Sequence, residues 1–142
     1  MTEVSFHTQL PDPLGYACRL LRKALHQGAE VVVTAPPETL KRLDQMLWTF
    51  DPLEFIAHRL LREGEVVAPR LRRTPIWLTL PGAAAPTHDV LINIDIDPVP
   101  GVESYRRVIE LVGNDEAQVL AARRRWRHYR ERGYTVAHHA LG

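Results

Sequence analysis

The first 34 residues constrain the fold more than any other stretch, because they predict a strand, a helix and a second strand in succession. Residues 4–8 read as a short strand. Asp12 suits a helix N-cap, Pro13 the first helical position and Gly28 the residue after a helix. The intervening apolar residues recur at helical spacing: Leu14, Ala17, Cys18, Leu21 and Leu25. Residues 30–34 are apolar and β-branched at their centre, as in a strand buried on both faces. Such a unit is expected to cross over right-handed onto a parallel sheet.

The rest of the chain continues this alternation. We expect a helix over 38–48, strands over 75–80 and 89–95, and a last helix that is capped by Asn114-Asp115 and runs to Arg132. Residues 134–139 follow as a final short strand or tail. Residues 105–112 fit a strand or a helix, and we favour a strand or a short mixed element. Residues 59–73 read as loop-rich, with a candidate edge strand at 65–68. The sequence therefore predicts a single α/β domain over residues 1–142, with helices flanking a mostly parallel central sheet in three layers.

Composition excludes several classes of protein. Of the 142 residues, 45% are hydrophobic and 25% charged, with a net charge of +1, so the whole molecule does not bind polyanions by bulk charge. Cys18 is the only cysteine, which excludes an internal disulfide. No apolar run approaches a membrane span and no signal-peptide pattern opens the chain, so we expect a cytoplasmic protein that does not contact a membrane.

The residues do not predict a nucleotide or metal site. A phosphate-binding turn needs glycines, whereas the turn after the first strand holds Pro11 and Pro13. The histidines are scattered without a His-Glu-x-x-His motif, so we expect no metal and no cofactor. Asp95 and Asp97 are two apart, as in a metal-dependent nuclease, but a strand-end turn explains them equally well. A nucleotide- or nucleic-acid-processing enzyme is the alternative function.

Residues 43–58 combine a helix end, a break and many aromatic side chains. Asp51-Pro52 ends the helix that precedes it. Five large apolar residues then fall within nine positions: Trp48, Phe50, Leu53, Phe55 and Ile56. Breaks between elements are normally polar and exposed. These side chains are therefore either part of the core or covered by another protein.

The last predicted helix concentrates the positive charge. Residues 116–132 hold six arginines and two glutamates, a net charge of +4, so the other residues together carry −3. Arg123, Arg127 and Arg130 form one ridge at helical spacing. Trp126, with Tyr129 one turn on, is expected to place apolar surface beside that charge. A solvated face explains a charge run, but arginine beside aromatic rings also suits a nucleic-acid strand or an acidic peptide that ends in a hydrophobic residue.

The stretch from Leu47-Trp48 to Phe50-Asp51-Pro52-Leu53-Glu54-Phe55-Ile56-Ala57-His58 closely resembles the chi subunit of bacterial DNA polymerase III holoenzyme, a part of its clamp-loader assembly. Weaker matches are Phe6-His7, Ala17-Cys18-Arg19-Leu20-Leu21, Tyr129-Arg130 and Gly133-Tyr134. The family typically has proline where this chain has Ala57. The resemblance implies a fold similar to nucleotide-binding domains and a non-catalytic accessory subunit that bridges two partners and contacts DNA mostly indirectly.

The resemblance also implies two binding surfaces. One binds the psi subunit as a 1:1 heterodimer, and here it would comprise Trp48, Phe55, Ile56 and Ala57, forming an exposed patch. The other binds the acidic C-terminal tail of single-stranded DNA-binding protein, which ends in phenylalanine. The matching positions are Val112, Arg123, Trp126 and Arg127, with Arg130 extending the ridge. A basic position of the family is Val119 here, so that one charge contact is either absent or supplied by Arg124.

Overall fold

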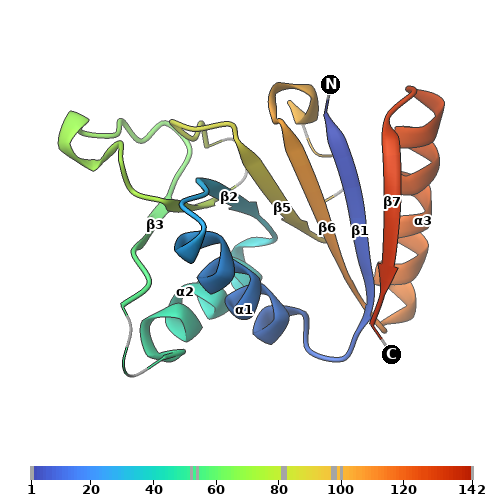
Figure 1. The fold of residues 1–142 in the computed structure, drawn as a ribbon, viewed down its shortest axis with the longest axis horizontal. Coiled ribbons are helices and arrows are strands. Elements are labelled where there is room, and N and C mark those ends of the chain that lie inside the picture. Colours follow the sequence, from blue (N-terminus) through green and yellow to red (C-terminus); the bar gives the residue numbers. More distant parts are fainter. Residues whose placement is uncertain are drawn as a thin grey trace.

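The computed structural model describes residues 2–51, 53, 55–80, 83–96, 99 and 101–141. Its strands are β1 (Glu3–Leu10), β2 (Val31–Thr34), β3 (His58–Leu61), β4 (Ile76–Thr79), β5 (Val90–Ile94), β6 (Arg107–Gly113) and β7 (Thr135–Ala140). Its helices are α1 (Pro13–His26), α2 (Pro37–Thr49) and α3 (Glu116–Glu131), with short 3-10 turns η1 (Pro69–Leu71) and η2 (Val102–Ser104). The described strands form one seven-stranded sheet in the order β3-β4-β2-β5-β6-β1-β7, and all pairs are parallel. The expected α/β fold class is confirmed (Figure 1).

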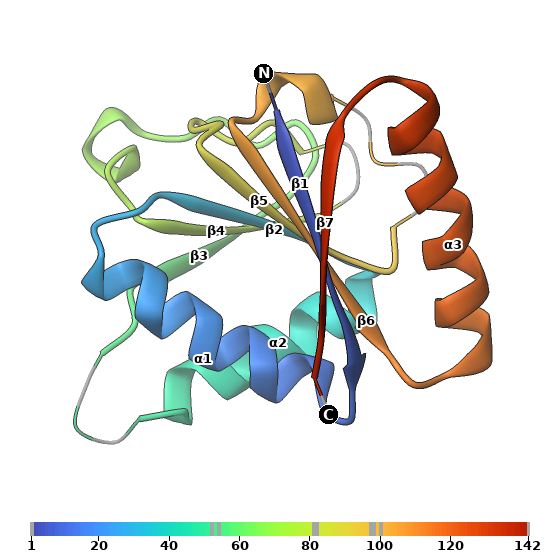
Figure 2. The ribbon, with the colours of Figure 1, turned by 45° about the vertical axis from the view of Figure 1, so that its right-hand side comes forward.

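The direction in which the chain crosses the sheet decides which face each helix covers. α1 and α2 lie in crossovers that run toward the β3 edge, from β1 to β2 and from β2 to β3. α3 lies in a crossover that runs the opposite way, from β6 past β1 to β7. Because parallel crossovers are right-handed, opposite directions place helices on opposite faces. Figures 1 and 2 show α1 and α2 on one face and α3 on the other, which gives the three layers.

Both faces of the sheet are buried, and the two helix layers cover them differently. All residues of β4 and β5 are buried. α1 and α2 contribute leucines such as Leu21 and Leu43 to one core cluster. Fully burying each such side chain stabilises the fold by about 1.5–3 kcal/mol. The residues that α3 buries are instead Ala121, Ala122, Arg125 and Tyr129. The third helix is therefore held by fewer large apolar side chains and by polar ones.

The helix ends form as the sequence predicts. The Asp12 carboxylate accepts a hydrogen bond from the N–H of Gly15 at 3.1 Å, and Pro13 opens α1. Gly28 follows α1 with φ of 72°, in the left-handed region that glycine tolerates best. Asp115 caps α3 in the same way, through the N–H of Gln118 at 3.3 Å. These caps fix where both helices begin, next to the ends of β1 and β6.

Two predictions about strands meet different outcomes. Residues 105–112 contain a strand, β6, as favoured, since its run of buried residues lies between two partners, β1 and β5. The edge strand expected at 65–68 is wrong. The edge strand is β3, which follows the aromatic break and pairs with β4. Leu61 is buried on the core side of β3, whereas Val66 is 89% exposed.

Candidate functional site

A pocket of about 380 Å³ opens beside α3 at the carboxyl ends of β1 and β6. Its lining comes from β1, β6, α3 and β7: Phe6, Thr8, Gln9, Val112, Gly113, Asn114, Val119, Ala122, Arg123, Trp126 and His138. We call it the α3 pocket. Among these described lining residues, Arg123 is the only arginine or lysine and there is no acid. The α3 pocket therefore combines apolar walls with a positive rim.

The topology of the sheet places this pocket. From the end of β1 the chain turns toward the α1 face, and from the end of the adjacent β6 it turns toward the α3 face. Neighbouring parallel strands whose connections leave toward opposite faces create a crevice at their carboxyl ends, where open α/β sheets bind ligands. The connections that follow β1 and β6 diverge around Gly113. A Cβ added at this glycine would lie 2.8 Å from Oε1 of Gln118 and 3.0 Å from Cγ of Pro13. A larger residue at 113 would have to displace those side chains.

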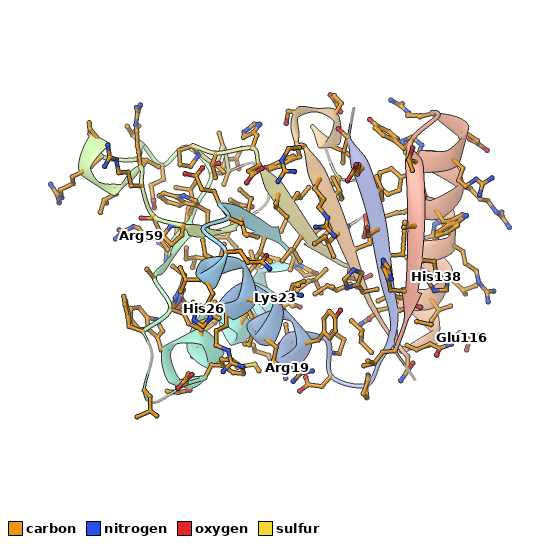
Figure 3. The ribbon with its side chains drawn as sticks, viewed as in Figure 1. Arg19, Lys23, His26, Arg59, Glu116 and His138 are labelled. Atoms are coloured by element: carbon orange, nitrogen blue, oxygen red, sulfur yellow. The ribbon has the colours of Figure 1, made fainter. Side chains whose placement is uncertain are left out.

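The walls of the α3 pocket are packed aromatic rings. The ring centroids of Phe6 and Trp126 are 5.2 Å apart, and those of Trp126 and His138 are 6.0 Å apart. His138 projects from β7 on the side where α3 lies, and its Nε2 is hydrogen-bonded to Oγ1 of Thr8 at 2.6 Å (Figure 3). Val112 is 3% exposed and forms part of the floor. Buried walls next to the half-buried Trp126 suit an apolar group of a ligand.

The arginines of α3 do not all belong to this pocket. Arg123 lines it, and Arg127 and Arg130 are exposed on the same ridge of the helix. Arg124 lies on the other flank of α3, in a second pocket with His128 and Arg132. Val119 itself lines the α3 pocket. Arg124 is therefore not placed to supply the charge that Val119 lacks, which corrects that expectation.

Tyr129, expected to place apolar surface beside the arginines, is buried, and so is Arg125 of the same helix. Arg125 is 4% exposed and Tyr129 is 3% exposed, and both reach Glu110, which is fully buried on β6. Nε of Arg125 donates to Oε1 of Glu110 at 3.0 Å, and the Tyr129 hydroxyl donates to Oε2 at 2.8 Å. Nδ2 of Asn93 donates to Oε1 at 2.8 Å. Tyr129 thus does not offer surface to a ligand; it anchors the helix that carries the pocket wall.

Burial shifts the acid–base balance of this cluster. It raises the pKa of Glu110, while Arg125 beside it and the donated hydrogen bonds act in the opposite direction. Burial and the Glu110 charge also raise the pKa of Tyr129 far above its ordinary value. The sequence held a signal that was missed: Asn93 and Glu110 are single polar residues inside apolar strands. In a sheet covered on both faces, such residues must meet polar partners.

The aromatic segment at the end of α2 is partly buried in the core and partly exposed. Trp48 is 57% exposed and Phe55 is 67% exposed, and their ring centroids are 5.6 Å apart. We call this pair the aromatic patch. Ala57 is half-buried beside it. Ile56 is 1% exposed and belongs to the core under α1 and α2, so its expected place in the exposed patch is wrong. Consecutive extended residues point to opposite sides, which separates Phe55 from Ile56.

The buried side chain of His58 packs against the aromatic patch. His58 packs against Trp48 with 4.8 Å between ring centroids. Its Nε2 lies 2.9 Å from Oδ1 of Asp44, and its Nδ1 lies 2.8 Å from the carbonyl oxygen of Ile56. These contacts fix the ring on which Trp48 rests, so the patch is a pre-formed surface.

Other candidate residues do not gather into a site. Asp95 is exposed after β5, while Asp97 lies outside the described residues. Within the described part of the chain, no three histidine, cysteine or acidic side chains lie together as metal ligands would. Cys18 is buried in the core, as expected from its helical position. No helix among the described residues is long and apolar enough to cross a membrane.

The fold and the strand-end pocket define the class of protein first. The structure is similar to a solved chain described as "Mss116p DEAD-box helicase domain 2 bound to an RNA duplex", with a TM-score of 0.62 and 9% identity. The match covers 99% of this chain, and this chain spans 64% of that one, just under two thirds of its length. At this identity the likeness shows the fold alone. The class that the fold defines is therefore an α/β domain with a parallel sheet.

Sequence comparison then gives the family. The sequence model of the family "DNA polymerase III chi subunit, HolC" matches residues 1–137. A Pseudomonas aeruginosa protein described as "DNA polymerase III subunit chi" is 36% identical over 147 aligned positions, covering 99% of this chain and 98% of that protein. A Haemophilus influenzae protein of the same description is 27% identical, covering 89% and 85%. The chain belongs to the DNA polymerase III chi subunit family, which confirms the resemblance.

Proposed function

We propose that this chain is a non-catalytic subunit that bridges the clamp loader, through the psi subunit, to single-stranded DNA-binding protein. The observation that carries the proposal is the α3 pocket. A C-terminal phenylalanine presents one ring and one carboxylate on the same residue. The pocket offers aromatic and apolar walls for the ring, and Arg123 at the rim for the carboxylate. Arg127 and Arg130 continue outward for the acidic residues that precede it.

The expected affinity follows from this division of roles. Burying the phenylalanine ring contributes roughly 1.5–3 kcal/mol. A charge-assisted hydrogen bond to Arg123 contributes about 1.5–3 kcal/mol where water is excluded, and under about 1 kcal/mol at an exposed rim. With Val119 at the family's basic position, fewer charges face the tail. Binding should therefore be modest, depend on the terminal ring and weaken as salt rises.

The aromatic patch is the proposed site for the psi subunit. Trp48 and Phe55 are large, exposed and fixed in place, as interface anchors are, and removing such anchors typically costs about 2 kcal/mol or more of binding. Trp48 lies in the last turn of α2 and Phe55 shortly before β3, whereas the lining of the α3 pocket includes His138 of β7. β3 and β7 are the opposite edges of the sheet. This separation suits a bridge, because both partners can bind at once.

Fluorescence anisotropy at low salt tests the tail site, with a labelled peptide that ends in the acidic tail and terminal phenylalanine. Arg123→Glu should abolish binding and Arg127→Glu should weaken it strongly. Arg124→Glu is the matched control, since it makes the same charge change on the same helix but on the other flank. Equal losses in all three variants would show a general charge effect instead of a site.

Co-purification tests the psi site. Phe55→Ala should abolish recovery of the psi subunit while tail binding stays unchanged. Arg123→Glu should give the opposite result. If either variant removed both partners, the two surfaces would not be independent and the bridging proposal would fail.

A further inference from the structure

β7 leaves one edge of the sheet open beside the α3 pocket. It pairs with β1 on one side and has no described strand on the other. All its residues except Val136 are exposed. Figure 2 shows β7 in front of the sheet, with the helices to either side. Proteins normally protect such an edge with proline, lysine or a bulge. β7 reads Thr-Val-Ala-His-His-Ala, without proline or lysine.

The backbone groups that face this edge can be identified. The N–H of Leu141 donates to the carbonyl oxygen of Thr8 on β1, at 3.0 Å. In a parallel strand the N–H and C=O of one residue point to the same side, and successive residues alternate. Residues 135, 137 and 139 therefore point toward β1, and Val136, His138 and Ala140 point outward. The open edge offers three N–H and three C=O groups.

The open edge and the α3 pocket meet at His138. Its side chain lines the pocket while its backbone faces the edge. The pocket lies at the carboxyl end of β1, where Thr8 is in register with Ala140 of β7. A peptide whose last residue occupies the pocket would have its preceding residues along β7, running in the same direction as β7. That is the direction of every strand in the sheet.

The charge beside the edge selects the occupant. Arg123, Arg127 and Arg130 lie on the ridge of α3 that borders the pocket, and they would repel a second copy of this chain. Arg123 and Arg127 are separated by about 6 Å along the helix. Side chains on one face of a strand repeat every 6.6–6.8 Å or so. Acidic residues at alternate positions of an added strand would thus match successive arginines.

We propose that the acidic segment before the terminal phenylalanine adds to β7 as an eighth, parallel strand. This inference rests on the proposed tail site and specifies how the tail is held there. Backbone hydrogen bonds to Val136, His138 and Ala140 supply affinity. The arginine ridge selects acidic side chains on the α3 face only. The segment is recognised by its extended backbone as well as by its charge.

N-methylated peptides test the backbone contact. Two versions of the tail peptide are compared, each methylated at alternate amides but offset by one residue, with the terminal phenylalanine unchanged. The version that blocks the amides facing β7 should bind about tenfold more weakly or worse, since each methyl group removes the donor of one backbone hydrogen bond to β7. The offset version should bind like the unmodified peptide. Equal affinities of the two versions would overturn the added strand while leaving the tail site intact. If the unmodified peptide did not bind, the proposed function itself would fail.

Two further measurements bear on the protein side. Amide hydrogen exchange should show new protection at Val136, His138 and Ala140 when the peptide is added, and unchanged exchange at residues 135, 137 and 139. Ala140→Pro removes an outward N–H without removing a bond to β1. It should weaken binding of the unmodified peptide severalfold, because the peptide carbonyl that accepts from this N–H loses its donor. Unchanged affinity of the Ala140→Pro variant, or unchanged exchange at the outward residues, would contradict the proposal.

Discussion

The strongest test of how this structure is held together is the buried pair of Glu110 and Arg125. Each has 4% or less of its side chain exposed. Glu110→Gln would leave the Arg125 guanidinium buried without its counter-charge. Nη1 of Arg125 already lacks a hydrogen-bond partner among the described residues. Breaking a buried pair from one side costs about 3–5 kcal/mol, so we expect a loss of that size in the free energy of unfolding.

The stability of a variant that lacks Arg125 should depend on pH in a different way. Arg125→Met leaves a buried carboxylate, which can take up a proton, whereas arginine cannot lose one. Burial raises the pKa of Glu110, and removing Arg125 takes away the largest influence that lowers it. Between the unfolded and folded pKa values, the folded variant holds a proton that the unfolded chain lacks. Its stability therefore rises as pH falls, by up to about 1.4 kcal/mol per pH unit.

Urea unfolding at pH 7 and pH 5 measures these differences. Glu110→Gln should lose about 3–5 kcal/mol at pH 7, relative to the unsubstituted protein. Arg125→Met should lose about 3 kcal/mol at pH 7 and recover roughly 1–3 kcal/mol of it at pH 5. The double variant should lose less than the two single losses combined. Additive losses, or a pH-independent loss below about 1 kcal/mol for Arg125→Met, would refute the view that this pair anchors α3.

Four other predictions follow from individual residues. Phe55→Ala should change the free energy of unfolding by under about 0.5 kcal/mol, whereas Ile56→Ala next to it should cost about 2–5 kcal/mol, both measured in urea. Burial lowers the pKa of His7 from 6.5 to about 4, helped by His139 and Arg107. As pH falls through that window, His7 takes up a proton in the unfolded chain before it does so in the folded protein, which destabilises the fold. His7→Gln should therefore reduce the loss in the free energy of unfolding between pH 7 and pH 4.5, by roughly 1–2 kcal/mol after solvent screening. Burial raises the pKa of the Cys18 thiol to about 11, so a thiol reagent at pH 8 should label it only after unfolding. Calorimetry should detect no saturable binding of ATP or divalent metal ions at micromolar concentrations.

Sequence patterns predicted the elements that local chemistry specifies. The caps at Asp12 and Asp115 and the left-handed glycine at Gly28 depend on neighbouring residues alone, and all three are confirmed. β3 was missed because its signal is weak. It is a four-residue strand whose place depends on pairing with β4, a contact between distant parts of the chain. Local propensity carries no information about such a partner.

The sequence predicted the candidate site less completely than it predicted the helix ends. Position within α3 distinguishes Arg123 from Arg125, yet both belong to a run of arginines in which charge alone suggests exposure. Only the sheet beneath the helix, with Glu110 at its centre, shows that Arg125 is buried. The convergence of Val112, Arg123 and Trp126 on one pocket came from family resemblance, because β6 and α3 supply them and periodicity within one element cannot relate the two.

The two aspartate caps make arginine side chains better placed than helix amides for the anion that the proposed tail would bring to this crevice. In many α/β proteins an anion at the carboxyl ends of the strands binds the free amides of a helix N-terminus. Here Asp12 occupies the start of α1, and a side chain at Gly15 would collide with its carboxylate. Asp115 likewise occupies the start of α3. Each cap accepts a hydrogen bond from one amide of the helix start and adds negative charge, which repels phosphate. The nearest positive charge that lines the pocket is Arg123, two turns into α3 and beside Trp126. A ligand that pairs a carboxylate with a hydrophobic ring fits that position better than a nucleotide does.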